Sequence, residues 1–258
     1  MALKQLLANS YTVRDYFGDA GQAVDTIKRI IGMGYDGIEI AYEQLIDPVR
    51  MKAIGDEHHF EYKVIAADFD FLTSGKDVFF AMCRAMGSVY ACIGAMPERY
   101  QGNHKGYAAF TAELNRLGRE LKDGGVTLLY HLHDFEFTKE DGRIGADLIA
   151  ESVDPQAALL LPDTYWIQAG GGTPSEWIKK LKSVTKSVHF KDYGLESHMK
   201  PKFMEVGEGN LNWTEILAAC EVSGVEWAAV EQDFCAGNPF HSLEISIKNL
   251  ERMGCRSR

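Results

Sequence analysis

The chain has 258 residues, a length that suits one large domain or two small ones. Hydrophobic residues make up 46% and charged residues 25% of it, as in ordinary globular proteins, so the composition excludes disordered and collagen-like chains. The net charge of −10 argues against a nucleic-acid partner, because binding a phosphate backbone needs a surplus of Lys and Arg.

Cysteine usage and hydropathy indicate the compartment. The five cysteines are odd in number and widely spaced, and none forms a C-x-x-C pair, which predicts reduced thiols inside a cell. The first residues show no signal-peptide pattern. No segment approaches the roughly 18 consecutive apolar residues of a membrane span. We therefore expect a cytoplasmic protein with no membrane partner.

Short apolar segments alternate with amphipathic segments along the whole chain. The apolar segments predict strands at residues 3–8, 37–41, 63–67, 89–94, 127–131, 158–161, 187–190 and 228–231. The amphipathic segments predict helices at residues 20–31, 48–58, 77–86, 105–123, 146–153, 174–184, 213–222 and 239–253.

Eight strand–helix units in about 250 residues predict a (β/α)₈ barrel, an α/β TIM barrel that forms a single domain over residues 1–258. An open, doubly wound sheet is the alternative. That fold normally carries a glycine-rich nucleotide-binding turn after its first strand, and residues 9–15 contain no glycine. The barrel is therefore the favoured interpretation.

Polar residues stand at the C-terminal ends of four consecutive predicted strands. In a barrel these ends meet at the rim that carries the chemistry. The residues are His131, with Glu136 beyond it, then Asp163, His189 and Glu231. Imidazole and carboxylate ligands suit one divalent ion such as Mn²⁺, Co²⁺, Zn²⁺ or Mg²⁺, and the absence of cysteine speaks against a closed structural zinc site.

Each of these residues also has an ordinary structural interpretation. His189 resembles a hydrogen-bonded core histidine, Asp163 a turn or helix cap, and Glu231 part of a solvated loop. Their shared position at one end of neighbouring strands favours a joint site.

Seven short segments resemble the sugar phosphate isomerase/epimerase superfamily, the xylose-isomerase-like barrels. They are residues 10–15, 34–39, 130–137, 163–166, 189–193, 206–209 and 230–233, and they occur in the family's order. The segments 130–137 and 189–193 are the most specific. The resemblance covers most of the chain and implies the same barrel fold.

The resemblance implies a divalent ion held by residues of strands five to eight. Asp163, His189 and Glu231 match three of the usual four ligands. The fourth is usually a Glu at the end of strand five, where this chain has His131, with Glu136 five residues further on. We expect His131 to be the ligand and Glu136 to be an acid/base group, and the reverse assignment is the alternative.

The resemblance also implies proton removal from a carbon next to a carbonyl. We expect a metal-dependent isomerase or epimerase acting on a small-molecule sugar or keto-sugar. A lyase or dehydratase of the keto-sugar or inosose type is the alternative, and a non-catalytic binding barrel is the third candidate. The branch that cleaves abasic DNA needs a basic groove, which a net charge of −10 disfavours. A homo-oligomer is compatible with the resemblance.

Several residues are candidates for acid/base work and for substrate binding. Glu231 is the best carboxylate for a double role as ligand and proton carrier, and His133 is a further base. Lys191 is placed to donate to a substrate oxygen or to pair with Asp192 or a carboxylate of the site. The residues expected to line the pocket are Tyr11, Arg14 and Trp166, although core packing is the alternative for the aromatic rings.

Overall fold

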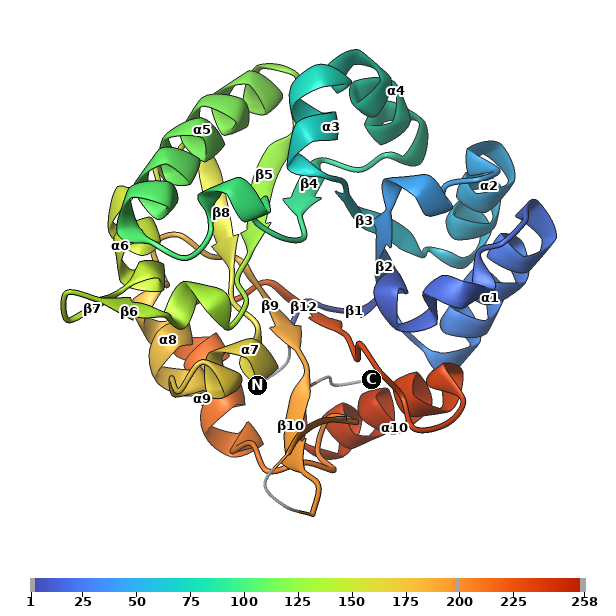
Figure 1. Cartoon of the computed structure of the whole chain (residues 1–258). Helices are drawn as coiled ribbons and strands as arrows, with labels where there is room; N and C mark the ends of the chain where they lie inside the picture. The colour runs from blue at the N-terminus through green and yellow to red at the C-terminus, as the bar shows by residue number, and fades with distance from the viewer. Residues whose placement is uncertain (1–2, 198–199, 256–258) are drawn as a thin grey trace.

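The computed structural model describes residues 3–197 and 200–255. Eight parallel strands form one sheet in the order β8-β5-β4-β3-β2-β1-β12-β9, and helices surround it (Figure 1). The strands are β1 Gln5–Asn9, β2 Gly37–Ala41, β3 Glu61–Ala66, β4 Tyr90–Ile93, β5 Thr127–His131, β8 Ala158–Leu161, β9 Ser187–Phe190 and β12 Trp227–Val230. The predicted TIM barrel is confirmed.

The α-helices follow the strands around the outside of the barrel. They are α1 Ala20–Met33, α2 Pro48–His58, α3 Phe69–Ser74, α4 Lys76–Met86, α5 His104–Asp123, α6 Gly145–Ser152, α7 Thr164–Ala169, α8 Pro174–Lys180, α9 Trp213–Val222 and α10 Pro239–Arg252. The 3₁₀ helices are η1 Ser10–Tyr16, η2 Tyr42–Gln44, η3 Glu98–Tyr100 and η4 Phe135–Phe137. Two hairpins project from the loops, β6 Lys139–Glu140 with β7 Arg143–Ile144, and β10 Asp192–Leu195 with β11 Pro201–Met204.

Helix boundaries follow from side-chain caps in the sequence. Asp19 accepts a hydrogen bond from the Gln22 amide at the start of α1, and Asn103 does the same for Gly106 at the start of α5. Gly34 ends α1 with a φ of 94°, a left-handed conformation that costs little without a Cβ atom. These caps explain why the predicted helices begin and end near the observed positions.

The structure contains elements that the sequence did not predict. These are α3, α7 and the two hairpins. The short helix α7 forms because the Asp163 carboxylate accepts hydrogen bonds from the Tyr165 and Trp166 amides, at 2.8 and 3.0 Å. The predicted helix at 174–184 is shorter, since α8 ends at Lys180.

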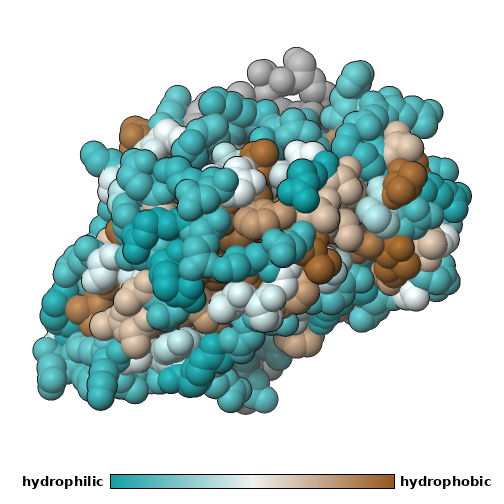
Figure 2. All heavy atoms as spheres, turned by 90° about the horizontal axis from the view of Figure 1, so that it is seen from above, coloured by the Kyte–Doolittle hydropathy of each residue, from teal (hydrophilic) through white to brown (hydrophobic). Residues whose placement is uncertain are grey.

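The buried side chains form two layers. Alternate strand residues fill the interior of the barrel, among them Leu7, Val64, Leu129 and Trp227. A larger cluster packs between the outer faces of the strands and the helices. Figure 2 shows one face of the molecule, seen from above relative to Figure 1, and this face is mainly hydrophilic with scattered hydrophobic groups. Within residues 3–197 and 200–255, no helix combines the length and apolarity needed to cross a membrane.

The barrel closes between β8 and β9 through a few contacts. Asp163 and His189 form an isolated parallel bridge, and the His189 amide donates to the Pro162 carbonyl at 2.9 Å. The Leu160 amide donates to the Val184 carbonyl at 2.7 Å. This closure brings the ends of the two strands together, and both bridge residues carry side chains of the chemistry predicted for a metal site.

Candidate metal centre

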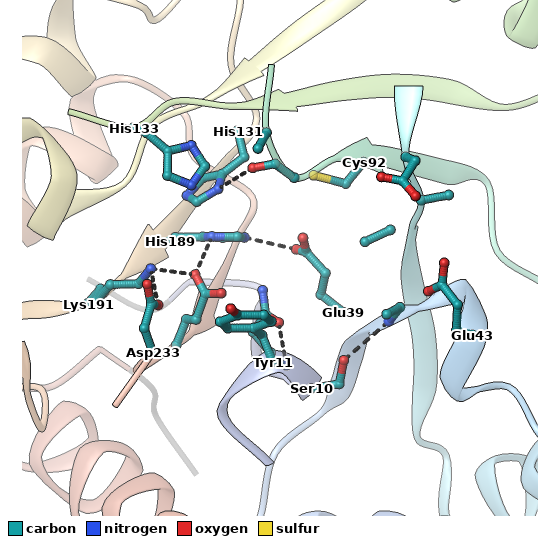
Figure 3. Close-up of a pocket in the computed structure, with 18 residues that line it drawn as sticks. Ser10, Tyr11, Glu39, Glu43, Cys92, His131, His133, His189, Lys191 and Asp233 are labelled. Atoms are coloured by element: carbon teal, nitrogen blue, oxygen red, sulfur yellow. Dashed lines mark hydrogen bonds and ion pairs between the residues drawn. The ribbon is translucent and has the colours of Figure 1, made fainter. Parts of the chain in front are cut away.

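A cavity of about 390 Å³ opens at the C-terminal ends of the barrel strands (Figure 3). Residues at the ends of seven of the eight strands line it, from Asn9 at the end of β1 to Glu231 and Asp233 after β12. His131, His133, His189 and Lys191 are also among the lining residues. The cavity therefore lies at the rim where the fold places its chemistry.

Four buried side chains converge beneath this cavity. They are His131, Asp163, His189 and Glu231, and one ligand atom of each lies within 4.8 Å of the others. His131 Nε2 is 3.1 Å from Asp163 Oδ2, and His189 Nδ1 is 3.0 Å from Glu231 Oε2. The structure thus brings together the four residues predicted as ligands, with His131 rather than Glu136 in the fourth position.

Secondary structure holds each member of this group in place. His131 is the last residue of β5, and its Nδ1 lies 3.2 Å from the Gly94 carbonyl oxygen, which orients the ring. The two carboxylate oxygens of Asp163 have different partners. Oδ1 caps α7, and Oδ2 faces His131 within the group of four. Both interpretations of Asp163, helix cap and candidate ligand, are therefore realised at once.

Carboxylates surround the His189 imidazole on both sides. Burial alone would lower the pKa of His189, but Glu39 and Glu231 raise it to about 10. Glu39 Oε2 lies 3.1 Å from Nε2, and Nδ1 faces Glu231 without hydrogen-bond geometry. The two carboxylates therefore favour the protonated ring, and a cation that binds at Nδ1 would displace a proton.

Lys191 is buried among the carboxylates of the site. Its Nζ lies 2.6 Å from Asp233, 2.9 Å from Glu231 and 3.3 Å from Asp163. Burial would lower the pKa of Lys191, but these carboxylates raise it well above its ordinary value. The ammonium is therefore charged and faces the cavity. Asp192 points elsewhere and accepts hydrogen bonds from amides of the loop after β11 and from the Trp213 indole of α9, the last at 2.6 Å.

His131, the last residue of β5, and His133, in the turn that follows, line the same cavity. The two rings are 4.5 Å apart between centroids, as expected because residues two positions apart on an extended chain point to the same face. The Glu136 carboxylate secures the turn, because it accepts hydrogen bonds from the His133 amide at 2.8 Å and from the Tyr130 hydroxyl.

Glu136 is consequently not where an acid/base group would need to be. Its side chain is fully buried outside the cavity, behind the strand, and it does not line the pocket. The predicted proton-transfer role of Glu136 is not supported by this position. The sequence placed a carboxylate near the strand end but did not show which way the turn directs it.

Burial raises the pKa of Glu136 to about 8, which predicts a pH-dependent stability. The folded state holds a proton that the unfolded chain loses near pH 4.5. The free energy of unfolding should therefore fall as the pH rises from about 5 to 8, by at most about 1.4 kcal/mol per pH unit from this group. Glu136→Gln should weaken that pH dependence, as measured by urea unfolding at several pH values. Equal pH dependence in both proteins would contradict the prediction.

His133 lines the cavity as a neutral imidazole. Burial lowers its pKa to about 2, and the nearby charges of His131 and Lys191 act in the same direction. Its ring stacks on Phe135 and lies 5.3 Å from Trp166 between centroids. A neutral ring can accept a hydrogen bond from a substrate hydroxyl, but a pKa this low makes it a weak base.

The three predicted substrate-binding residues occupy different positions. Tyr11 lines the cavity and is half exposed. Trp166 packs on His133, with Lys191 Nζ 5.2 Å from its ring centroid, but does not line the cavity. The Arg14 guanidinium lies over the Tyr11 ring and donates to the Tyr11 and Asp233 carbonyls, so it supports the rim from outside.

Sequence reasoning missed Glu39, which lies deep in the barrel. It is 2% exposed and its carboxylate contacts His189 Nε2 (Figure 3). The signal in the sequence was a single acidic residue between Ile38 and Ile40, in a strand that is otherwise apolar. Those isoleucines pack toward the helices, so Glu39 points inward. Asp233, the partner of Lys191, was also not singled out.

Glu39→Gln should weaken metal binding without removing a ligand. A carboxylate that accepts from a histidine fixes its tautomer and makes its other nitrogen a better ligand, and its loss typically costs 10–100-fold in metal affinity. Titration with Co²⁺, followed by the visible absorption of the bound ion, measures this. Glu43→Gln, which removes a carboxylate of the same cavity that does not contact His189, is the matched control. Equal Co²⁺ affinity in the Glu39 variant and the native protein would refute this role.

A family model described as a xylose isomerase-like TIM barrel matches residues 27–234, which is most of the chain. The chain belongs to this family. Among curated relatives, an inosose dehydratase from Clostridium botulinum is 28% identical in an alignment of 170 positions that covers 59% of this chain and 55% of that protein. The chain thus matches only about half the length of that relative.

Two solved structures share the fold over nearly the whole chain. A sugar phosphate isomerase/epimerase from Parabacteroides distasonis has a TM-score of 0.79 at 17% identity, and the match covers 98% of this chain and 96% of that one. The IOLI protein, solved with a bound zinc atom, has a TM-score of 0.74 at 16% identity, with 96% and 97% covered. At these identities the likeness concerns the fold.

The donor atoms that this chain's own structure brings together suit a divalent ion. Two imidazoles and two carboxylates converge in a buried group, and His189 Nδ1 has no hydrogen-bond partner among the described residues. Mixed nitrogen and oxygen donors of this kind suit Zn²⁺, Co²⁺ or Mn²⁺. The group could therefore hold a metal ion.

Proposed function

We propose that the chain is a divalent-metal-dependent enzyme that removes a proton next to the carbonyl of a keto-sugar or related keto-polyol. The buried group of His131, Asp163, His189 and Glu231 at the base of an open cavity carries this proposal. A non-catalytic binding barrel would not need a charged lysine buried beside such a group. Membership of an enzyme family supports the same reading.

The four residues would hold the ion, and the ion would supply charge stabilisation for the enolate that forms when the C–H bond breaks. We expect Mn²⁺, Co²⁺ or Zn²⁺ to bind more tightly than Mg²⁺, because imidazole ligands suit these metals better.

The chain's own side chains would handle the proton and the substrate oxygens. Glu231 has a carboxylate at the cavity wall and is the candidate proton acceptor. The Lys191 ammonium would donate to a substrate oxygen that gains negative charge or leaves as water. His133 would accept a hydrogen bond from a substrate hydroxyl and orient it. Tyr11 would cover the substrate at the mouth of the cavity.

Two reactions follow from the same proton removal. Loss of water from the enolate is dehydration, and the inosose dehydratase relative supports this outcome for a cyclic keto-polyol. Return of the proton to the same or a neighbouring carbon is epimerisation or isomerisation, which the sugar phosphate isomerase/epimerase neighbour supports. We favour dehydration, because the sequence identity to the inosose dehydratase, 28%, is higher than the 17% identity to the sugar phosphate isomerase/epimerase.

Product analysis tests the proposal. The protein is stripped with EDTA, reloaded separately with Mn²⁺, Co²⁺, Zn²⁺ or Mg²⁺, and incubated with inosose or fructose. NMR then identifies a new isomer or epimer, which has the mass of the substrate, and mass spectrometry identifies a product that has lost water. Conversion that requires the added metal supports the proposal. Full conversion by the stripped protein would contradict metal dependence, and no conversion with any of the metals would contradict the substrate assignment.

A further inference from the structure

The wall of the cavity opposite Lys191 is acidic. Glu43 lies in η2 after β2, and Asp68 follows β3 at the start of α3. Both side chains line the cavity and are exposed, and Figure 3 places Glu43 across the pocket from Lys191 and Asp233. Within residues 3–197 and 200–255, no ion pair engages either of the two carboxylates.

The charges around the cavity are unbalanced. The lining carboxylates are Glu39, Glu43, Asp68, Glu231 and Asp233. Of the described residues that line the cavity, Lys191 is the one lysine or arginine, and its ammonium already contacts three carboxylates. Arg14 is nearby, but its guanidinium donates to two backbone carbonyls outside the cavity. Even with a divalent ion bound, the negative charges outnumber the positive ones.

Much of the remaining surface of the cavity is made of small residues. Ala41, Ala66, Ala67, Gly94 and Ala95 line the same cavity as these carboxylates and the buried histidines. Their short side chains leave room for a compact molecule, and a volume of about 390 Å³ is within the range of small-molecule sites. A ligand that reaches the metal group therefore also meets Glu43 and Asp68.

We propose that this site selects a neutral polyhydroxylated ketone and rejects its phosphorylated and carboxylated counterparts. The inference rests on the proposed function and names its substrate class. Glu43 and Asp68 accept hydrogen bonds from hydroxyls remote from the reacting carbonyl, and hydrogen bonds to a charged acceptor are stronger than neutral ones. The same carboxylates repel a phosphate or carboxylate, because like charges placed together disfavour binding.

Three cyclic polyols of similar size and different charge serve as probes of the metal-loaded protein. They are myo-inositol, which is neutral, myo-inositol 1-phosphate and quinate, which carries a carboxylate. Dissociation constants are measured by calorimetry at one fixed salt concentration. We expect myo-inositol to bind about tenfold more tightly than either anion, or better. In Glu43→Gln/Asp68→Asn, myo-inositol should bind more weakly and the anions more tightly, so the ratio falls.

Asp25→Asn is the matched control, because Asp25 is an exposed carboxylate on α1 that does not line the cavity. It should leave all three constants unchanged. The inference is overturned if an anion binds the native protein as tightly as myo-inositol does, if myo-inositol does not bind, or if the double variant keeps the native ratio. Turnover of inosose is measured separately. A protein that prefers the neutral probe but converts no keto-polyol contradicts the proposed reaction, and an active protein that prefers an anion contradicts only the substrate class.

Discussion

Glu231→Gln should lose divalent metal far more readily than the native protein, with a drop in affinity larger than the 10–100-fold typical of losing a residue that only supports a ligand. Glu231 contributes one of the two carboxylates of the group, and its Oε2 lies within 3.0 Å of both His189 Nδ1 and Lys191 Nζ. A neutral amide of the same size removes the charge that attracts a cation. Metal content after dialysis and Co²⁺ titration measure the effect.

Glu136→Gln provides a matched control for that variant. It makes the same chemical change at a glutamate that is also buried but lies outside the cavity. It should therefore keep its metal, whereas His131→Ala should lose affinity as Glu231→Gln does. One ion retained at native affinity in Glu231→Gln would contradict the assignment of Glu231 as a ligand. Metal loss from Glu136→Gln, with full retention in His131→Ala, would show that Glu136 and not His131 is the fourth ligand.

Lys191→Met should lower turnover by roughly 10²–10⁴-fold, the range for loss of a general acid or base. The ammonium is buried beside the group that would hold the metal and faces the cavity. Metal binding distinguishes this role from a structural one. Removing a positive charge 2.9 Å from Glu231 should leave metal affinity unchanged or raise it, although turnover falls.

Lys186→Met is the control for the lysine variant, because Lys186 is a half-exposed residue that pairs with Glu226 away from the cavity. Its turnover and metal affinity should match those of the native protein. Native turnover in Lys191→Met, with metal bound, would show that this lysine only neutralises the neighbouring carboxylates.

Periodicity and strand ends were enough to predict the barrel and the group of four. The observed bounds of β5, β8 and β9 coincide with the predicted ones, so the residues at their ends could be placed on one rim. His131, Asp163, His189 and Glu231 do meet there. This succeeded because the position of a residue along a parallel strand determines its height in a barrel.

The orientation of residues in turns could not be predicted in this way. Glu136 is close to the rim in sequence, but its direction depends on hydrogen bonds from Tyr130 and the His133 amide, which tertiary packing determines. Glu39 posed the opposite difficulty. It lies within a strand rather than at its end, and its contact with His189 joins residues that are 150 positions apart.

Solvent hydrogen exchange at the carbon next to the carbonyl tests the central claim most directly. The metal-loaded protein is incubated in D₂O with inosose, and substrate and product are read by NMR and mass spectrometry. We expect deuterium to appear at that carbon, and not to appear in the EDTA-treated protein or in Glu231→Gln. A substrate labelled with deuterium at the same carbon is run alongside in ordinary water and should lose its label. Turnover without deuterium from D₂O, together with complete transfer of the substrate's label to the neighbouring carbon, would show an internal hydride shift and contradict proton removal.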